Sequence, residues 1–195
     1  MDAFELLVQA HRPAMKTVLA ELVEMLRANG VRYVIGGANA LSLYVRPRMT
    51  VDIDAFVDAA RKDDVDRILS GRFQLVDIAR FHSKFRQGDV EIDILYAGAD
   101  AEDFALASGR DAVILGTQVK AASPEALLWL YLVSEKDLNF HDGVALLRSQ
   151  PNLDLALVRG AIERHNPAAL PKLERMLTAA QEPERSYEAS RTRRQ

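Results

Sequence analysis

Two short stretches decide the fold of this chain: Val34–Ala38, which reads Val-Ile-Gly-Gly-Ala, and Val51–Ala55, which reads Val-Asp-Ile-Asp-Ala. The first places a glycine pair between an apolar strand and the start of a helix. The second alternates apolar and acidic residues, and strand residues two apart project from one face, so Asp52 and Asp54 are predicted to lie side by side. Adjacent carboxylates repel each other unless a proton or a cation lies between them. Together the two stretches indicate metal-assisted phosphoryl or nucleotidyl chemistry.

A second acidic strand is predicted over Val90–Tyr96, with Glu91 and Asp93 on its polar face. If this strand neighbours the first, three or four carboxylates converge. Sites made of oxygen ligands alone suit Mg²⁺ or Mn²⁺, and waters and substrate phosphates usually complete them. From the residues alone, either Glu91 or Asp93 could supply the third carboxylate.

The glycine pair predicts a place for phosphate. Gly36 and Gly37 lack β-carbons, so the backbone can approach an anion closely. The N–H groups of the helix that follows would then hold that anion. Arg48, between this helix and the acidic strand, could neutralise phosphate charge, and Lys84, just before the second acidic strand, is another cationic candidate.

The pattern along the chain predicts an α/β (α+β) fold, with a small mixed sheet flanked by helices. Residues 1–122 form the α/β core with its N-terminal helices, within which Pro13 divides a helix over residues 3–29. At Ser123 the composition changes, and residues 123–180 are predicted to be a helical C-terminal subdomain. Residues 181–195 are polar and lack apolar periodicity, which is typical of a flexible tail.

Composition excludes several classes of protein. The chain has 195 residues, 49% of them hydrophobic, a net charge of -3 and no cysteine. No cysteine means no disulfide framework, thiolate metal site or cysteine nucleophile, and it fits a cytoplasmic location. The negative charge provides no overall attraction to nucleic acid. No apolar run approaches the length of a membrane span, and the acidic N-terminus does not resemble a secretory signal.

Three motifs carry a resemblance to a known family: Gly-Gly-Ala-x-Ala at 36–40, Arg-x-Thr-x-Asp-Ile-Asp at 48–54 and Ile-Asp-Ile-Leu at 92–95. They resemble the nucleotidyltransferase superfamily of DNA polymerase β type, and most of all its small bacterial branch with AbiEii-like toxins. The resemblance covers roughly residues 30 to 150. It implies a minimal nucleotidyltransferase fold and Mg²⁺-dependent transfer of a nucleoside monophosphate from a triphosphate such as ATP to a hydroxyl, with release of pyrophosphate.

The same resemblance implies roles for individual residues. Asp52 and Asp54 would be metal ligands, and Asp93 would be the third ligand and the general base for the acceptor hydroxyl. Gly36 and Gly37 would hold the triphosphate. The acceptor could be RNA such as tRNA, a protein or a small molecule, and the toxin branch adds a possible antitoxin partner; no membrane is implied.

One departure from the family concerns a lysine. Many relatives carry a lysine facing the nucleotide in the helix after Ser123, but here no cation precedes Lys136. Lys136, Lys84 or an arginine could take its place. Otherwise the chain could be a catalytically weakened member that works as a binding or interaction module. A sugar-nucleotide enzyme is a third possibility, but it predicts a larger nucleotide-binding domain. His82 is predicted to be a surface or hydrogen-bonding residue rather than a catalyst, and Tyr131 is predicted to belong to the core of the helical subdomain.

Overall fold

The structure is a computed structural model, and it describes residues 3–48, 50–98 and 100–182. Its central sheet has seven strands in the order β3-β4-β5-β2-β1-β7-β6, with both parallel and antiparallel pairs. The strands are β1 (Tyr33–Ile35), β2 (Asp52–Asp58), β3 (Gln74–Ile78), β4 (His82–Gln87), β5 (Val90–Ala97), β6 (Arg110–Ile114) and β7 (Thr117–Ala121). The predicted α/β fold with a mixed sheet is confirmed.

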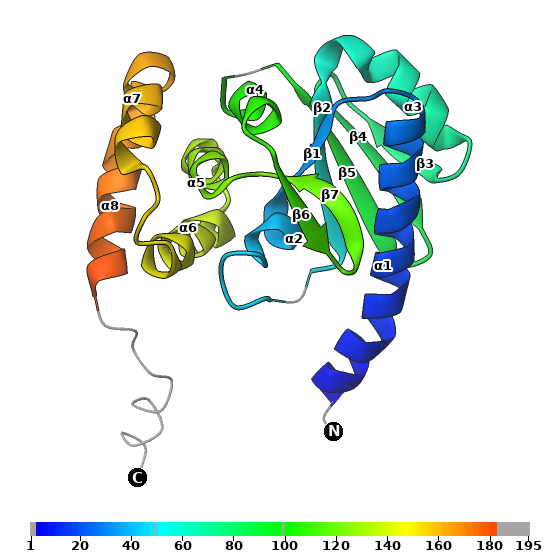
Figure 1. The fold of residues 1–195 in the computed structure, drawn as a ribbon, viewed down its shortest axis with the longest axis horizontal. Coiled ribbons are helices and arrows are strands. Elements are labelled where there is room, and N and C mark those ends of the chain that lie inside the picture. The colour runs from blue at the N-terminus through cyan, green and yellow to red at the C-terminus, as the bar shows by residue number, and fades with distance from the viewer. Residues whose placement is uncertain (1–2, 49, 99, 183–195) are drawn as a thin grey trace.

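Helices cover both faces of this sheet (Figure 1). They are α1 (Ala3–Ala28), α2 (Gly37–Leu41), α3 (Lys62–Ser70), α4 (Asp100–Ala107), α5 (Pro124–Val133), α6 (Asp137–Ser149), α7 (Leu155–His165) and α8 (Leu170–Gln181), with the 3-10 turns η1 (Ala59–Arg61) and η2 (Pro167–Ala169). Helices α1 and α3 contact each other and the sheet on one side, whereas α2 and α4 contact β2 and α5 on the other.

The alternation of β2 and β5 separates the two faces. Ile53 and Ala55 of β2, and Ile92 and Ile94 of β5, are fully buried in the same apolar core as Leu22 of α1. The acidic residues that alternate with them project from the opposite face. One face of each strand is therefore held by hydrophobic burial, and this fixes which side chains the other face presents.

The two acidic strands are neighbours in the sheet, which is the condition under which their carboxylates were predicted to converge. β2 and β5 pair in parallel, and their register sets Asp54 opposite Asp93 and Asp52 opposite Glu91. Because parallel strands in register present their same-face residues in rows, the carboxylates come together without a loop having to position them.

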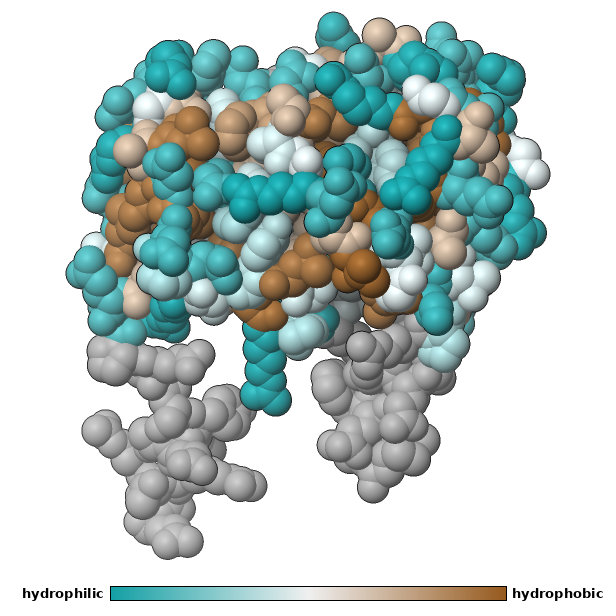
Figure 2. Space-filling view, viewed as in Figure 1, coloured by the Kyte–Doolittle hydropathy of each residue, from teal (hydrophilic) through white to brown (hydrophobic). Residues whose placement is uncertain are grey.

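In the described part of the chain, every element after β7 is helical. The Ser123 side chain accepts from the Ala126 N–H at the start of α5, with Pro124 in the first turn. Helices α5 to α8 lie on the side of the sheet that faces away from α1 and α3 (Figure 1). The face drawn in Figure 2 is hydrophilic around its rim and carries hydrophobic patches nearer its middle.

Element boundaries differ from the prediction in a few places. Helix α1 continues through Pro13, which costs it one backbone hydrogen bond but does not end it. Helix α2, the predicted helix after the glycine pair, is short and ends at Leu41. Gln181 still belongs to α8, and the rest of the predicted tail after Glu182 lies outside the described residues. No helix in the described ranges is both long and apolar enough to cross a membrane.

Candidate active site

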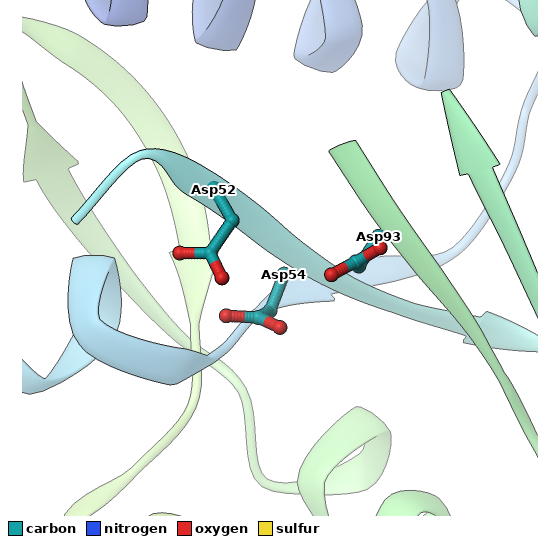
Figure 3. Close-up of side chains that lie close together, drawn as sticks. All are labelled: Asp52, Asp54 and Asp93. Atoms are coloured by element: carbon teal, nitrogen blue, oxygen red, sulfur yellow. The ribbon is translucent and has the colours of Figure 1, made fainter. Parts of the chain in front are cut away.

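Three aspartates form the centre of the site. One carboxylate oxygen each from Asp52, Asp54 and Asp93 lies within 4.8 Å of the other two. Figure 3 shows Asp52 and Asp54 on β2 with Asp93 beside them on the neighbouring strand β5. These are the three aspartates that the sequence predicts as metal ligands, and the structure brings them together.

The glycine pair packs directly against this cluster. Gly37 has φ +53°, a conformation that side chains disfavour, and a β-carbon placed there would lie 1.8 Å from Oδ2 of Asp54. At Gly36 a β-carbon would meet the Phe56 ring at 2.4 Å, and the Gly36 N–H donates to the Asp54 carbonyl oxygen (N···O 2.9 Å). Both glycines are needed because the start of α2 lies against the acidic strand.

Crowding changes the acidity of Asp54. Its burial, together with the charges of Asp52 and Asp93, raises the pKa of the Asp54 carboxyl from 3.8 to about 7. The positive charges of Lys136 and Arg48 oppose this rise. The nearby positive charges do not fully neutralise this cluster, and a bound cation would stabilise it.

Asp52 is oriented by two neighbours. The Thr50 hydroxyl donates to Oδ1 of the Asp52 carboxylate, and the buried Asn39 amide donates to the Asp52 carbonyl oxygen (N···O 2.8 Å). Thr50 belongs to the motif that precedes the first aspartate. Asn39 ties the short helix α2 to β2, so the helix start and the acidic strand keep their relative position.

Asp93 has partners on β4, the next strand. Nε2 of His82 lies 3.0 Å from Oδ1 of Asp93, and Nζ of Lys84 lies 3.4 Å from the same oxygen. Lys84 also contacts Oε2 of Glu91 at 3.0 Å, and this bond raises the pKa of the Lys84 ammonium. The predicted hydrogen-bonding role of His82 is seen here, with Asp93 as its partner.

Glu91, the alternative third carboxylate, is engaged elsewhere. Its Oε1 pairs with Arg86 at 2.8 Å and its Oε2 with Lys84, and these bonds lower the pKa of the Glu91 carboxyl. Three carboxylates therefore converge rather than four, and Asp93 is the one that joins Asp52 and Asp54.

A cavity of about 520 Å³ opens over Asp52 and Asp54, between the sheet and the helices α4, α5 and α6. Gly37, Arg48 and Lys136 line it, so three of the predicted nucleotide-binding residues reach this space. Lys84 and Gly36 are not among the described residues that line it. Lys136 enters from the residue just before α6, beside the end of the α5 helix that carries no lysine of its own.

Arg48 is held by a residue that sequence reasoning did not select. Its Nη2 and Nε contact the two carboxylate oxygens of Asp142 on α6, at 2.8 and 3.2 Å. This hydrogen bonding raises the pKa of the Arg48 guanidinium, and Asp142 is only 6% exposed. The two residues are 94 positions apart, and no local pattern in the sequence connects them.

Two further polar groups on the cavity wall were also missed. The Tyr131 hydroxyl and Oε2 of Glu102 are buried and have no hydrogen-bond partner among the described residues. Burial raises the pKa of both groups. Tyr131 is core, as predicted, since it is 4% exposed, but its hydroxyl also reaches the cavity. The sequence signal available for both was only a polar group within an apolar helix face.

Comparison with known proteins yields no match to a protein-family model and none to a curated protein. Solved structures do match. The solution structure of the antibiotic-resistance factor ANT(2'')-Ia has a TM-score of 0.62 and 19% identity, covering 84% of this chain and 98% of that one. The chain has the fold of ANT(2'')-Ia. A crystal structure of ANT(2'')-Ia in complex with adenylyl-2''-tobramycin gives 0.60 and 19%, covering 77% and 98%. The predicted nucleotidyltransferase fold is thereby confirmed.

The aspartate cluster fits a divalent metal. Ligand oxygens about one Mg²⁺ lie roughly 2.1 Å from the ion and thus up to about 4.2 Å apart, close to the spacing of these carboxylates. All three ligands are hard oxygen donors, and the charges of Asp52 and Asp93 add to burial in raising the pKa of Asp54. The residues present therefore suit Mg²⁺ or Mn²⁺ better than a softer metal.

Proposed function

We propose that this chain is a Mg²⁺-dependent nucleotidyltransferase, which transfers a nucleoside monophosphate from a nucleoside triphosphate to a hydroxyl group. The observation that carries the proposal is the convergence of Asp93 with Asp52 and Asp54, two residues that line a cavity, in a chain with the fold of ANT(2'')-Ia. Neither the fold nor an acidic cluster would be sufficient by itself, because one fold hosts many functions.

The three aspartates are the proposed metal ligands. Mg²⁺ or Mn²⁺ held there would neutralise the carboxylates and the phosphate charge that develops at the reacting phosphorus. Without such a cation the negative charge at Asp54 would repel a triphosphate, as its raised pKa indicates.

The triphosphate is proposed to lie against Gly37, Arg48 and Lys136, which line the cavity. Asp142 fixes the Arg48 guanidinium through two hydrogen bonds, which pre-organises it. Lys136 supplies the second positive charge, in place of the lysine that α5 lacks. The buried Tyr131 hydroxyl, near Asp142, Arg48 and Asp54, is a further donor for a phosphate oxygen.

The proposed reaction is an in-line displacement. The acceptor oxygen forms a bond to the α-phosphorus, the bond from that phosphorus to the bridging oxygen breaks, and pyrophosphate leaves with the electron pair. Asp93 is the proposed base for the hydroxyl proton, and His82 with Lys84 hold its Oδ1 in place from β4.

The acceptor is proposed to be a small molecule. ANT(2'')-Ia binds an adenylylated tobramycin, and ATP is the corresponding donor proposed for this chain. The cavity volume of about 520 Å³ is also that of a small-molecule site. Transfer of the label to RNA or to protein would be an alternative result of the labelling experiment described next.

The direct test is to incubate the protein with each labelled triphosphate, with and without Mg²⁺, in the presence of cellular RNA, protein or a small-molecule extract. We expect label to move to one class of acceptor only when Mg²⁺ is present. Asp54→Asn should abolish this transfer, whereas Glu91→Gln, which changes an acid outside the cluster, should retain most of it. Full transfer by Asp54→Asn would refute the assignment of the site.

Membership of the AbiEii-like branch, a toxin role and an antitoxin partner stay predictions of the sequence resemblance. They are tested by expressing the chain in bacteria with and without the product of an adjacent gene. Growth arrest that depends on Asp54 and is relieved by that product would support the toxin role. Tight binding of that product without any Mg²⁺-dependent triphosphate binding would favour the interaction module instead.

A further inference from the structure

The register of β2 and β5 places a second row of side chains beyond the carboxylates. Asp54 is opposite Asp93, and two residues further along the same strands Phe56 is opposite Leu95. Both Phe56 and Leu95 line the cavity. Because a strand rises about 3.3 Å per residue, this apolar row lies roughly 7 Å from the row of carboxylates. The cavity thus continues from the reacting centre onto an apolar floor.

Glu102 of α4 lines the same cavity, together with this apolar row. Its Oε2 is buried and has neither a hydrogen bond nor an ion pair with any residue that the structure describes. The cations of the cavity, Arg48 and Lys136, oppose the rise in the pKa of Asp54, whereas burial and the neighbouring acids Asp103 and Asp100 raise the pKa of Glu102. A buried acceptor without a partner is costly, and a ligand that donates a hydrogen bond would remove that cost.

We propose that Phe56, Leu95 and Glu102 form the acceptor subsite, and that the acceptor is a small molecule with an apolar ring between its reacting hydroxyl and a positively charged amine. The amine donates to Oε2 of Glu102, the ring covers Phe56 and Leu95, and the hydroxyl lies at Asp93. This inference rests on the proposed function, since it takes the reacting centre from it, but the binding it describes requires no transfer of nucleotide.

The distribution of charge in the cavity favours this acceptor over a nucleic acid. The cations Arg48 and Lys136 act on Asp54, next to Gly37, whereas Phe56, Leu95 and Glu102 contribute apolar carbon and a carboxylate to the cavity lining. A phosphodiester lying against these three residues would meet the negative charge of Glu102, for which no described residue forms a compensating ion pair. An ammonium group would instead gain a charge-assisted hydrogen bond.

A matched pair of probes tests the subsite: trans para-aminomethylcyclohexanol and its neutral hydroxymethyl analogue. Each is titrated by ligand-observed NMR into the full chain with Mg²⁺, at about pH 8, where carboxylates are generally ionised. We expect the amine to bind about five- to tenfold more tightly than the diol, because the hydroxymethyl group can also donate a hydrogen bond but lacks the positive charge that strengthens the bond to a carboxylate. Glu102→Gln should reduce this preference to within about twofold.

Asp103→Asn is the matched control, because it removes one negative charge from the adjacent, exposed position of the same helix. It should leave the preference for the amine unchanged. Equal binding of the two probes by the wild-type protein would overturn the proposal, and this comparison does not depend on the folding of any variant. An equal loss of preference in both variants would also overturn the proposal, since the preference would then come from the overall negative charge of α4 and not from a contact with Glu102.

The transfer assay separates this inference from the proposed function. Mg²⁺-dependent turnover of a triphosphate without a preference for the amine would refute the subsite alone. Amine binding that requires Glu102, in a protein that transfers no nucleotide, would support the subsite and refute the enzymatic proposal.

Discussion

Asp54→Asn should stabilise the protein when metal is absent, although it removes a residue that we place at the reacting centre. The pKa of Asp54 is about 7 in the folded protein against an ordinary value of 3.8. The folded state therefore holds this proton more tightly than the unfolded chain does. By linkage, the free energy of unfolding falls as pH rises from about 4 to about 7, and the loss is complete above that range.

The size of the effect follows from the same values. A pKa difference of one corresponds to about 1.4 kcal/mol, so the ionised carboxylate costs the fold up to about 4 kcal/mol. Asp54 keeps some contact with solvent, and we therefore expect about 2 to 4 kcal/mol. Asparagine has nearly the same shape but does not ionise, so the variant should exceed the wild type in unfolding free energy by this amount at about pH 8.

Urea denaturation in EDTA, at about pH 5 and about pH 8, measures this difference. Added Mg²⁺ should stabilise the wild type and have little effect on Asp54→Asn, so that the two proteins approach or exchange their order of stability. Asp89→Asn, an exposed acid in the turn before β5, is the control and should change stability by no more than about 0.5 kcal/mol. A variant that is less stable than the wild type in EDTA at about pH 8 would refute the reasoning.

Two other substitutions probe how the site is held. Gly37→Ala should abolish transfer and destabilise the fold, because its β-carbon would lie 1.8 Å from Oδ2 of Asp54. Gly30→Ala is the control, because Gly30 has a similar φ of +61° but a β-carbon there would meet nothing within 4 Å. In thermal melting it should lose only about 1 kcal/mol of stability, and its transfer activity should not change. Asp142→Asn should raise the KM for the triphosphate several-fold with a smaller change in kcat, since it removes the negative charge and one of the two oxygens that hold the Arg48 guanidinium. An unchanged KM in steady-state kinetics would show that Arg48 does not bind the phosphates.

The centre of the site could be predicted from the sequence because its geometry is local. Period-two alternation fixes which face of a strand carries Asp52 and Asp54, and the same pattern repeats around Asp93. The long-range contact that joins the two acidic pairs is the pairing of β2 with β5. This pairing is favoured because it buries the hydrophobic faces of both strands in one core. Resemblance to a family then distinguished Asp93 from Glu91, which the structure engages with Lys84 and Arg86.

The walls of the cavity could not be predicted in this way. Asp142 reaches Arg48 across 94 residues because α6 packs against α5 and α8, and Glu102 lines the same cavity as Phe56 because α4 packs on β2. No periodicity encodes such contacts, since each depends on how whole elements dock. Lys136 is an exception: it was predicted from the sequence as one possible substitute for the cation that α5 lacks, and the structure places it on the cavity wall.

The centre of the site is set by local sequence patterns, whereas the cavity wall depends on how the helices pack, and this difference has a consequence for substrate specificity. The carboxylates and the glycine turn are built into one sheet and one short helix, so they can persist while α4, α5 and α6 change. The groups that would select the acceptor, above all Glu102, belong to those docked helices. Substitutions in α4 should therefore change which acceptor is used without altering Mg²⁺-dependent triphosphate binding, whereas substitutions in β2 should remove both.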